Sequence, residues 1–192
     1  YGLLLATGVL GIFLLNLPVL AILCIFSKEL LVFLFGPVYQ QAYTSLIALA
    51  VGHFFLSLAI TSQSVIKMLS KTKLFLLNTT IWLAISVILN IILIPRLGIV
   101  GAAISVAVAL IVYHTITILQ IYKLEGLQPY NSRYIRILIS GALVFIPLPY
   151  IKESLDPSFI SFIFLAVASS ILYFVLVVLF RSLERSDKHV IK

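Results

Sequence analysis

The sequence predicts an all-α membrane protein with six transmembrane helices. Hydrophobic residues make up 62% of the 192 residues and charged residues only 10%, against ~25% charged residues in a soluble domain. Six apolar stretches contain no Asp, Glu, Lys or Arg, and the short loops between them hold almost all the charge. A bilayer core is crossed by about 20 helical residues. Only helices and closed barrels satisfy their backbone in lipid, and these stretches are too long and continuous for barrel strands.

Each predicted helix follows one of the apolar stretches. We place membrane-spanning helices at 3–26, 42–66, 74–94, 98–122, 134–151 and 158–180. The fifth is the shortest, and Pro147 and Pro149 near its end predict a kink or an early stop. The apolar stretch 30–35 is too short to span a bilayer, so we expect an interfacial turn of helix ended by Gly36-Pro37.

The first helix carries two further signals. Asn16 and Pro18 predict a bend there; a simple proline kink is the common cause, and an unwound segment of the kind found in transporters is the alternative. The chain begins at Tyr1, without an initiator Met and almost directly in an apolar stretch. A signal peptide would show a basic start and a short apolar core. We therefore expect a fragment that lacks its N-terminal part.

The basic residues predict the orientation in the membrane. With six spans, one side holds ten of them: Lys67, Lys71, Lys73, Lys123, Arg133, Arg136, Arg181, Arg185, Lys188 and Lys192. The other side holds three, namely Lys28, Arg96 and Lys152. Cytoplasmic loops carry the excess of Lys and Arg. Both ends of the chain are therefore predicted to be cytoplasmic, as an even number of spans requires, and the same distribution explains the net charge of +7 without nucleic acid as a partner.

The residue types needed for covalent chemistry are not grouped in this sequence. Cys24 is the only cysteine, so neither an internal disulfide nor a Cys–His metal site is expected. No predicted span contains Asp or Glu, although ion-coupled carriers usually need a carboxylate in the membrane. There is no glycine-rich phosphate loop. We expect no catalytic residues, no metal site, no cofactor and no enzymatic activity.

Polar side chains instead form a stripe on the second predicted helix. His53, Ser57, Thr61 and Ser64 are spaced 4, 4 and 3 residues apart, which places them on one face. That face could line a hydrated substrate cavity, or it could pack against another helix with its hydroxyls bonded to carbonyls of their own helix. Asn90 on the third helix is a further cavity candidate, although its position also suits interhelical hydrogen bonding or capping of the next turn.

Small residues follow on the fourth predicted helix. Gly101, Ser105 and Ala109 form a ladder of the small-xxx-small type, which lets another helix approach closely. His114, near the cytoplasmic end of the same helix, is expected to be solvated at the level of the lipid headgroups. Cys24 is expected to be a small residue facing lipid or the helix core.

Two segments carry a resemblance to a known family. They are 35–42, FGPVYQQA, and 90–103, NIILIPRLGIVGAA. Together they resemble the C-terminal half of polysaccharide-biosynthesis flippases, in the multidrug/oligosaccharidyl-lipid/polysaccharide exporter superfamily. Val38 departs from the family pattern, which often has an acidic residue there. The residues that carry the structural motif are Gly36, Pro37, Tyr39, Pro95, Gly98 and Gly101. Pro95 is expected to end a helix and Gly98 to allow a tight turn.

The resemblance implies an architecture and a function. Residues 1–122 would be a four-helix part of the second bundle, and 123–192 would be two additional helices with a cytoplasmic tail. The implied activity is translocation of a lipid-linked oligosaccharide across the plasma membrane for cell-surface polysaccharide. The implied partners are membrane lipid, the lipid-linked glycan and the missing N-terminal helix bundle. The alternatives are a drug or metabolite exporter of the same superfamily, and a membrane-bound glycan polymerase or acyltransferase, which would need a larger outward loop.

Overall fold

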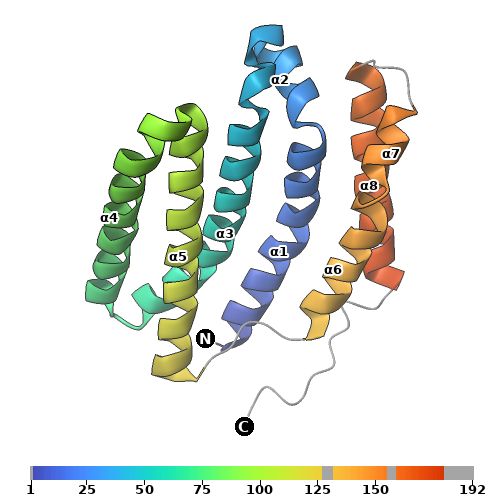
Figure 1. The fold of residues 1–192 in the computed structure, drawn as a ribbon. Coiled ribbons are helices and arrows are strands. Elements are labelled where there is room, and N and C mark those ends of the chain that lie inside the picture. Colours follow the sequence, from blue (N-terminus) through green and yellow to red (C-terminus); the bar gives the residue numbers. More distant parts are fainter. Residues whose placement is uncertain (1, 127–131, 155–158, 180–192) are drawn as a thin grey trace. The chain divides into compact units, whose positions relative to one another are not determined.

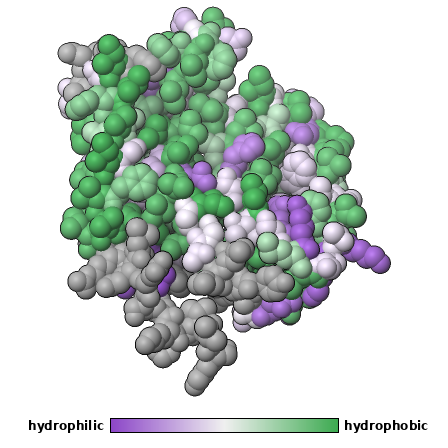
Figure 2. All heavy atoms as spheres, turned by 180° about the vertical axis from the view of Figure 1, so that it is seen from behind, coloured by the Kyte–Doolittle hydropathy of each residue, from purple (hydrophilic) through white to green (hydrophobic). Residues whose placement is uncertain are grey.

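The computed structural model describes residues 2–126, 132–154 and 159–179, and it confirms the predicted fold class (Figure 1). The described residues are helical apart from short turns, and no strand occurs among them. They include six helical segments long and apolar enough to cross a membrane, at 5–25, 37–68, 72–97, 99–125, 133–153 and 160–179. Hydrophobic side chains cover much of the surface of these helices in the space-filling view (Figure 2), as contact with lipid requires.

The chain divides into two compact units, 3–128 and 129–192. The helices of the first unit are α1 (Gly2–Ile25), α2 (Ser27–Phe35), the 3-10 helix η1 (Pro37–Ala42), α3 (Tyr43–Met68), α4 (Thr72–Leu97) and α5 (Ile99–Glu125). The second unit contains α6 (Ser132–Phe145), α7 (Leu148–Glu153) and α8 (Phe159–Leu179). The two predicted domains, 1–122 and 123–192, stay a prediction about the arrangement of a larger protein.

The first unit begins with an unbroken helix. Pro18 lies inside α1, which continues on both sides of it, so the alternative of an unwound segment is wrong for this structure. The predicted turn of helix after it is confirmed as α2, which begins at Ser27, three residues before the expected apolar stretch. Gly36 then adopts a φ of +98°, a conformation that side chains with a Cβ rarely adopt, and Pro37 starts η1.

Helix α5 is the centre of the first unit because small residues let α3 approach it very closely. A Cβ atom added to Gly52 on α3 would lie 2.7 Å from the Cα atom and 3.1 Å from the Cβ atom of Ala107 on α5. Ala103 and Ala107 are both buried. This crossing depends on residues that have almost no side chain, as in other membrane helix pairs.

The motif at 90–103 forms the hairpin between α4 and α5. The expectation that Pro95 ends the helix is wrong, since α4 continues through Pro95 to Leu97. Proline near a helix C-terminus removes one hydrogen bond but does not prevent one further turn. Gly98 has a φ of +56° and reverses the chain, as expected. Gly101 then lies directly against the backbone of α4 at Leu93.

At the other end of this helix pair, two amide side chains join α4 to α5. Asn78 Nδ2 donates to Gln120 Oε1 at 2.7 Å, and Gln120 Nε2 donates to Asn78 Oδ1 at 2.8 Å. Asn78 is buried. Beyond this pair, Lys71 Nζ lies 3.9 Å from Glu125 Oε1, which places the α3–α4 loop beside the end of α5. Lys67, Lys71, Lys73 and Lys123 therefore gather at one end of the unit.

In the second unit, the prolines act as expected. Helix α6 ends at Phe145 and a separate helix, α7, starts at Leu148, with Pro147 as its N-cap and Pro149 at its beginning. Helices α6 and α8 contact each other through the rings of Phe145 and Tyr173, whose centroids are 5.8 Å apart. The predicted tail with Arg181, Arg185, Lys188 and Lys192 lies outside the described residues.

Candidate functional site

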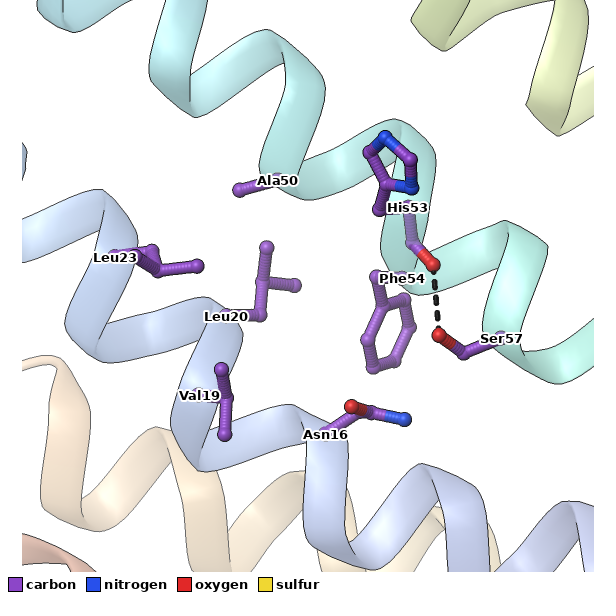
Figure 3. A pocket seen from close by; sticks show the side chains of 8 residues that line it. All are labelled: Asn16, Val19, Leu20, Leu23, Ala50, His53, Phe54 and Ser57. Atoms are coloured by element: carbon purple, nitrogen blue, oxygen red, sulfur yellow. Dashed lines mark hydrogen bonds between the residues drawn. The ribbon is translucent and has the colours of Figure 1, made fainter.

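A small cavity lies between α1 and α3, next to the predicted polar stripe (Figure 3). Its volume is about 100 Å³, and its lining residues are Asn16, Val19, Leu20, Leu23, Ala50, His53, Phe54 and Ser57. The two helices are held apart by large side chains, since the rings of Phe13 and Phe54 meet with centroids 5.4 Å apart. At the level of the cavity α1 meets α3 through these rings, whereas the close approach of Gly8 on α1 to Thr61 on α3 lies outside its lining.

The polar groups of the cavity come from both helices. Figure 3 shows the Asn16 side chain reaching from α1 toward Ser57 on α3, with the Phe54 ring between Asn16 and His53. Together they offer an amide, an imidazole and a hydroxyl on an otherwise apolar wall. These groups can bind hydroxyl or phosphoryl oxygens through hydrogen bonds. Ligand pockets usually enclose ~300–1,000 Å³, so this cavity suits one polar group and not a whole oligosaccharide.

The structure divides the predicted stripe of four residues into two parts. His53 and Ser57 line the cavity, and Ser57 Oγ donates to the carbonyl oxygen of His53 at 2.9 Å. Thr61 is buried where α1 packs closely, because a Cβ on Gly8 would lie 2.7 Å from its Cγ2 atom. Ser64 Oγ donates to the carbonyl oxygen of Ile60 at 2.9 Å and does not line the cavity. His53 and Ser57 thus border the cavity, Thr61 lies at a close contact with α1, and Ser64 lies outside the cavity.

The remaining candidate, Asn90, lies on α4 and is not among the residues that line this cavity. Its Oδ1 atom is buried and accepts no hydrogen bond from the described residues. Gly36, Pro37 and Tyr39 lie at the α2–η1 turn. They shape that turn and do not contribute to the cavity lining.

Two features of the first unit were not expected from the sequence: the burial of His114 and the hydrogen-bonded pair of Asn78 and Gln120. His114 is buried, with its ring centroid 5.7 Å from that of Phe55, so the expectation of a solvated histidine is wrong. The residue lies on the side of α5 that packs against α3. The Asn78–Gln120 pair was missed, although an Asn and a Gln in two neighbouring apolar spans are a usable signal.

The site provides binding groups but no grouped metal ligands. Among the described residues, no set of three His, Cys, Asp or Glu side chains is close enough to hold a metal ion. Cys24 is partly exposed and not fully buried. The polar atoms of the α1–α3 cavity are hydrogen-bonding groups of Asn16, His53 and Ser57.

Comparison with known proteins supports the membrane assignment. No family model matches the chain. The chain is 28% identical over 159 residues to an uncharacterized membrane protein of Methanocaldococcus jannaschii. The match covers 79% of the chain and 31% of that protein, so the chain spans about a third of the length of the relative. With its six apolar helices, the chain is a multi-pass, all-α membrane protein.

Proposed function

We propose that the chain is the C-terminal part of a flippase that moves a lipid-linked oligosaccharide across the plasma membrane for cell-surface polysaccharide. The observation that carries this proposal is the hairpin at 90–103, where the sequence that resembles the exporter superfamily forms a tight α4–α5 turn. Each motif glycine has a physical role there: Gly98 takes a positive φ and Gly101 packs on the Leu93 backbone. The residues of the resemblance thus match positions where the fold needs them.

The proposed mechanism is alternating access. One bundle rocks against another around a shared site near the middle of the membrane, without covalent chemistry. In this proposal the α1–α3 cavity with Asn16, His53 and Ser57 is one wall of the path and binds a sugar hydroxyl or a phosphoryl oxygen. Its volume of about 100 Å³ agrees with a partial site. The opposite wall would come from a further, N-terminal helix bundle, and the lipid-linked glycan and membrane lipid would be the ligands.

The proposed orientation puts both ends of the chain in the cytoplasm. Lys67, Lys71, Lys73 and Lys123 share one end of the first unit, whereas Lys28 and Arg96 lie at the other end of its helices. The excess of basic residues favours the cytoplasm for the first end.

Cysteine labelling tests this orientation. In a Cys24→Ala background, Lys73→Cys should resist a membrane-impermeant maleimide added to intact cells, and Arg96→Cys should react. Both residues are exposed at helix ends, so each new thiol is reachable once the reagent arrives. After the cells are permeabilised, both positions should react. Labelling of Lys73→Cys in intact cells, with Arg96→Cys protected, would reverse the orientation.

Transport is tested with the full-length protein in proteoliposomes and a fluorescent polyprenyl-diphosphate oligosaccharide. Protein-dependent movement between leaflets is expected, and His53→Phe should slow it about tenfold, the effect of losing one hydrogen bond of ~1.4 kcal/mol. Ser64→Ala is the matched control, because Ser64 bonds only to a carbonyl of its own helix and lies outside the cavity. Export of small drugs with no movement of the glycolipid would reject the flippase proposal.

A further inference from the structure

We propose that a second pocket, formed by α2, η1 and the start of α3, binds the phosphate headgroup of an anionic membrane lipid. The pocket has a volume of about 260 Å³ and is lined by Lys28, Pro37, Gln40, Gln41 and Tyr43. It lies at the end of the first unit opposite the Lys71–Glu125 pair. The proposal concerns a lipid that stays with the protein and is independent of the transported substrate.

The pocket carries the positive charge of Lys28, whose ammonium group can interact with a ligand. Lys28 Nζ lies 4.5 Å from the centroid of the Tyr43 ring, a cation–π contact that positions the ammonium group at the pocket. Within the described part of the chain, Lys28 forms no ion pair with a carboxylate. The neighbouring Glu29 has its Oε2 atom buried, whereas Lys28 is exposed. The ammonium N–H groups can therefore donate to a phosphate oxygen, which lysine binds as a point charge.

Two amide side chains add neutral donors beside this charge. Gln40 and Gln41 are exposed on η1, and neither makes a side-chain hydrogen bond with the described residues. Each amide NH₂ group can donate to a phosphoryl or glycerol oxygen. One cation, two amides and the Tyr43 ring match a headgroup that carries both a phosphate and hydroxyl groups.

The apolar surface next to the pocket indicates that the phosphate belongs to a lipid. Phe33, Leu34 and Phe35 at the end of α2 are 58%, 63% and 62% exposed, and Val38 on η1 is 82% exposed. The ring of Phe35 is 5.6 Å from that of Tyr39, so both aromatic groups form one surface. An apolar surface of this kind inserts at the boundary of headgroups and acyl chains. It would hold the pocket at headgroup depth and leave the acyl chains in the adjacent leaflet.

The test measures lipid binding to the purified full-length protein by native mass spectrometry, with phosphatidylglycerol and phosphatidylcholine as probes. Lys28→Gln should weaken phosphatidylglycerol binding about fivefold, the factor that ~1 kcal/mol per basic residue near a membrane gives. Binding of phosphatidylcholine should not change. Lys73→Gln is the matched control, since it removes one exposed lysine at the opposite end, and it should leave the tightest phosphatidylglycerol site intact.

Further measurements make the outcome decisive. If Lys28→Gln fails to fold, the double variant Gln40→Ala/Gln41→Ala is measured in its place, because both glutamine side chains are exposed. Its phosphatidylglycerol binding is expected to be about threefold weaker. Equal losses in Lys28→Gln and Lys73→Gln would show unspecific charge attraction and overturn the proposal. Displacement of phosphatidylglycerol by millimolar inorganic phosphate would identify a free-phosphate site and overturn the assignment to lipid. These results leave the transport assay unaffected, so the two proposals fail separately.

Discussion

Replacing Gly101 with leucine is expected to destabilise the chain by about 3 kcal/mol or more, the upper range for overpacking a tight contact. A Cβ atom at this position would lie 2.6 Å from the carbonyl carbon of Leu93 and closer still to its oxygen. All the atoms it meets belong to the α4 backbone, so no side chain can rotate away. The α4–α5 hairpin would have to open. Thermal unfolding in detergent micelles should show a large loss of stability, and Gly101→Ala a smaller one.

Gly11 provides the matched control for this steric argument. It lies inside α1, and a Cβ added there meets nothing within 4 Å. Gly11→Ala should therefore be neutral or stabilising by up to ~1 kcal/mol, because alanine is the better helix former. Equal loss of stability in Gly101→Ala and Gly11→Ala would contradict a specific contact between Gly101 and the Leu93 backbone.

The amide pair is expected to give the second large effect. Asn78→Leu should lower the free energy of unfolding by about 2 kcal/mol, because it leaves the Gln120 amide without its reciprocal partner at the helix interface. Double-mutant cycles of polar pairs in a membrane protein give up to ~1.7 kcal/mol, so a larger coupling is not expected. The measurement is unfolding of Asn78→Leu, Gln120→Leu and the double variant under identical detergent conditions.

The double variant decides the interpretation. When both amides are replaced by leucine, no polar group is left unpaired, so Asn78→Leu/Gln120→Leu should be more stable than the sum of the single effects predicts. Strict additivity of the two single variants would mean that the distances of 2.7 and 2.8 Å do not represent coupled hydrogen bonds in the folded protein.

The helices could be predicted from the sequence because a long apolar stretch without charged residues indicates a helix that is surrounded by lipid. The break at Pro147 and the turn at Gly98 were also predictable, since proline and glycine act locally. The path of α4 beyond Pro95 was not, because one lost hydrogen bond near a C-terminus does not fix the last residue of a helix.

Only part of the predicted polar stripe borders the cavity, and the reason is a different one. Helical periodicity places His53 and Ser64 on one face, yet that face meets α1 at one level and only part of it borders a cavity. The level depends on Phe13 and Phe54 meeting across two helices. Contacts between residues that are far apart in the sequence produce no repeating pattern of residue types, so they cannot be predicted from periodicity. The burial of His114 against Phe55 could not be predicted for the same reason.

The unequal spacing of helices in the first unit has a mechanical consequence. Helix α3 is locked to α5 at Gly52, where two backbones nearly touch, and α5 is locked to α4 at Gly101. Sliding of one helix along another at these two contacts would bring main-chain atoms into collision, so we expect α3, α4 and α5 to resist such sliding. Helix α1 meets α3 through the rings of Phe13 and Phe54, and its close approach at Gly8 is to the side chain of Thr61 and not to the α3 backbone. Side chains can change rotamer as a helix slides, so we expect relative motion within this unit to be easiest between α1 and α3, where the cavity lies.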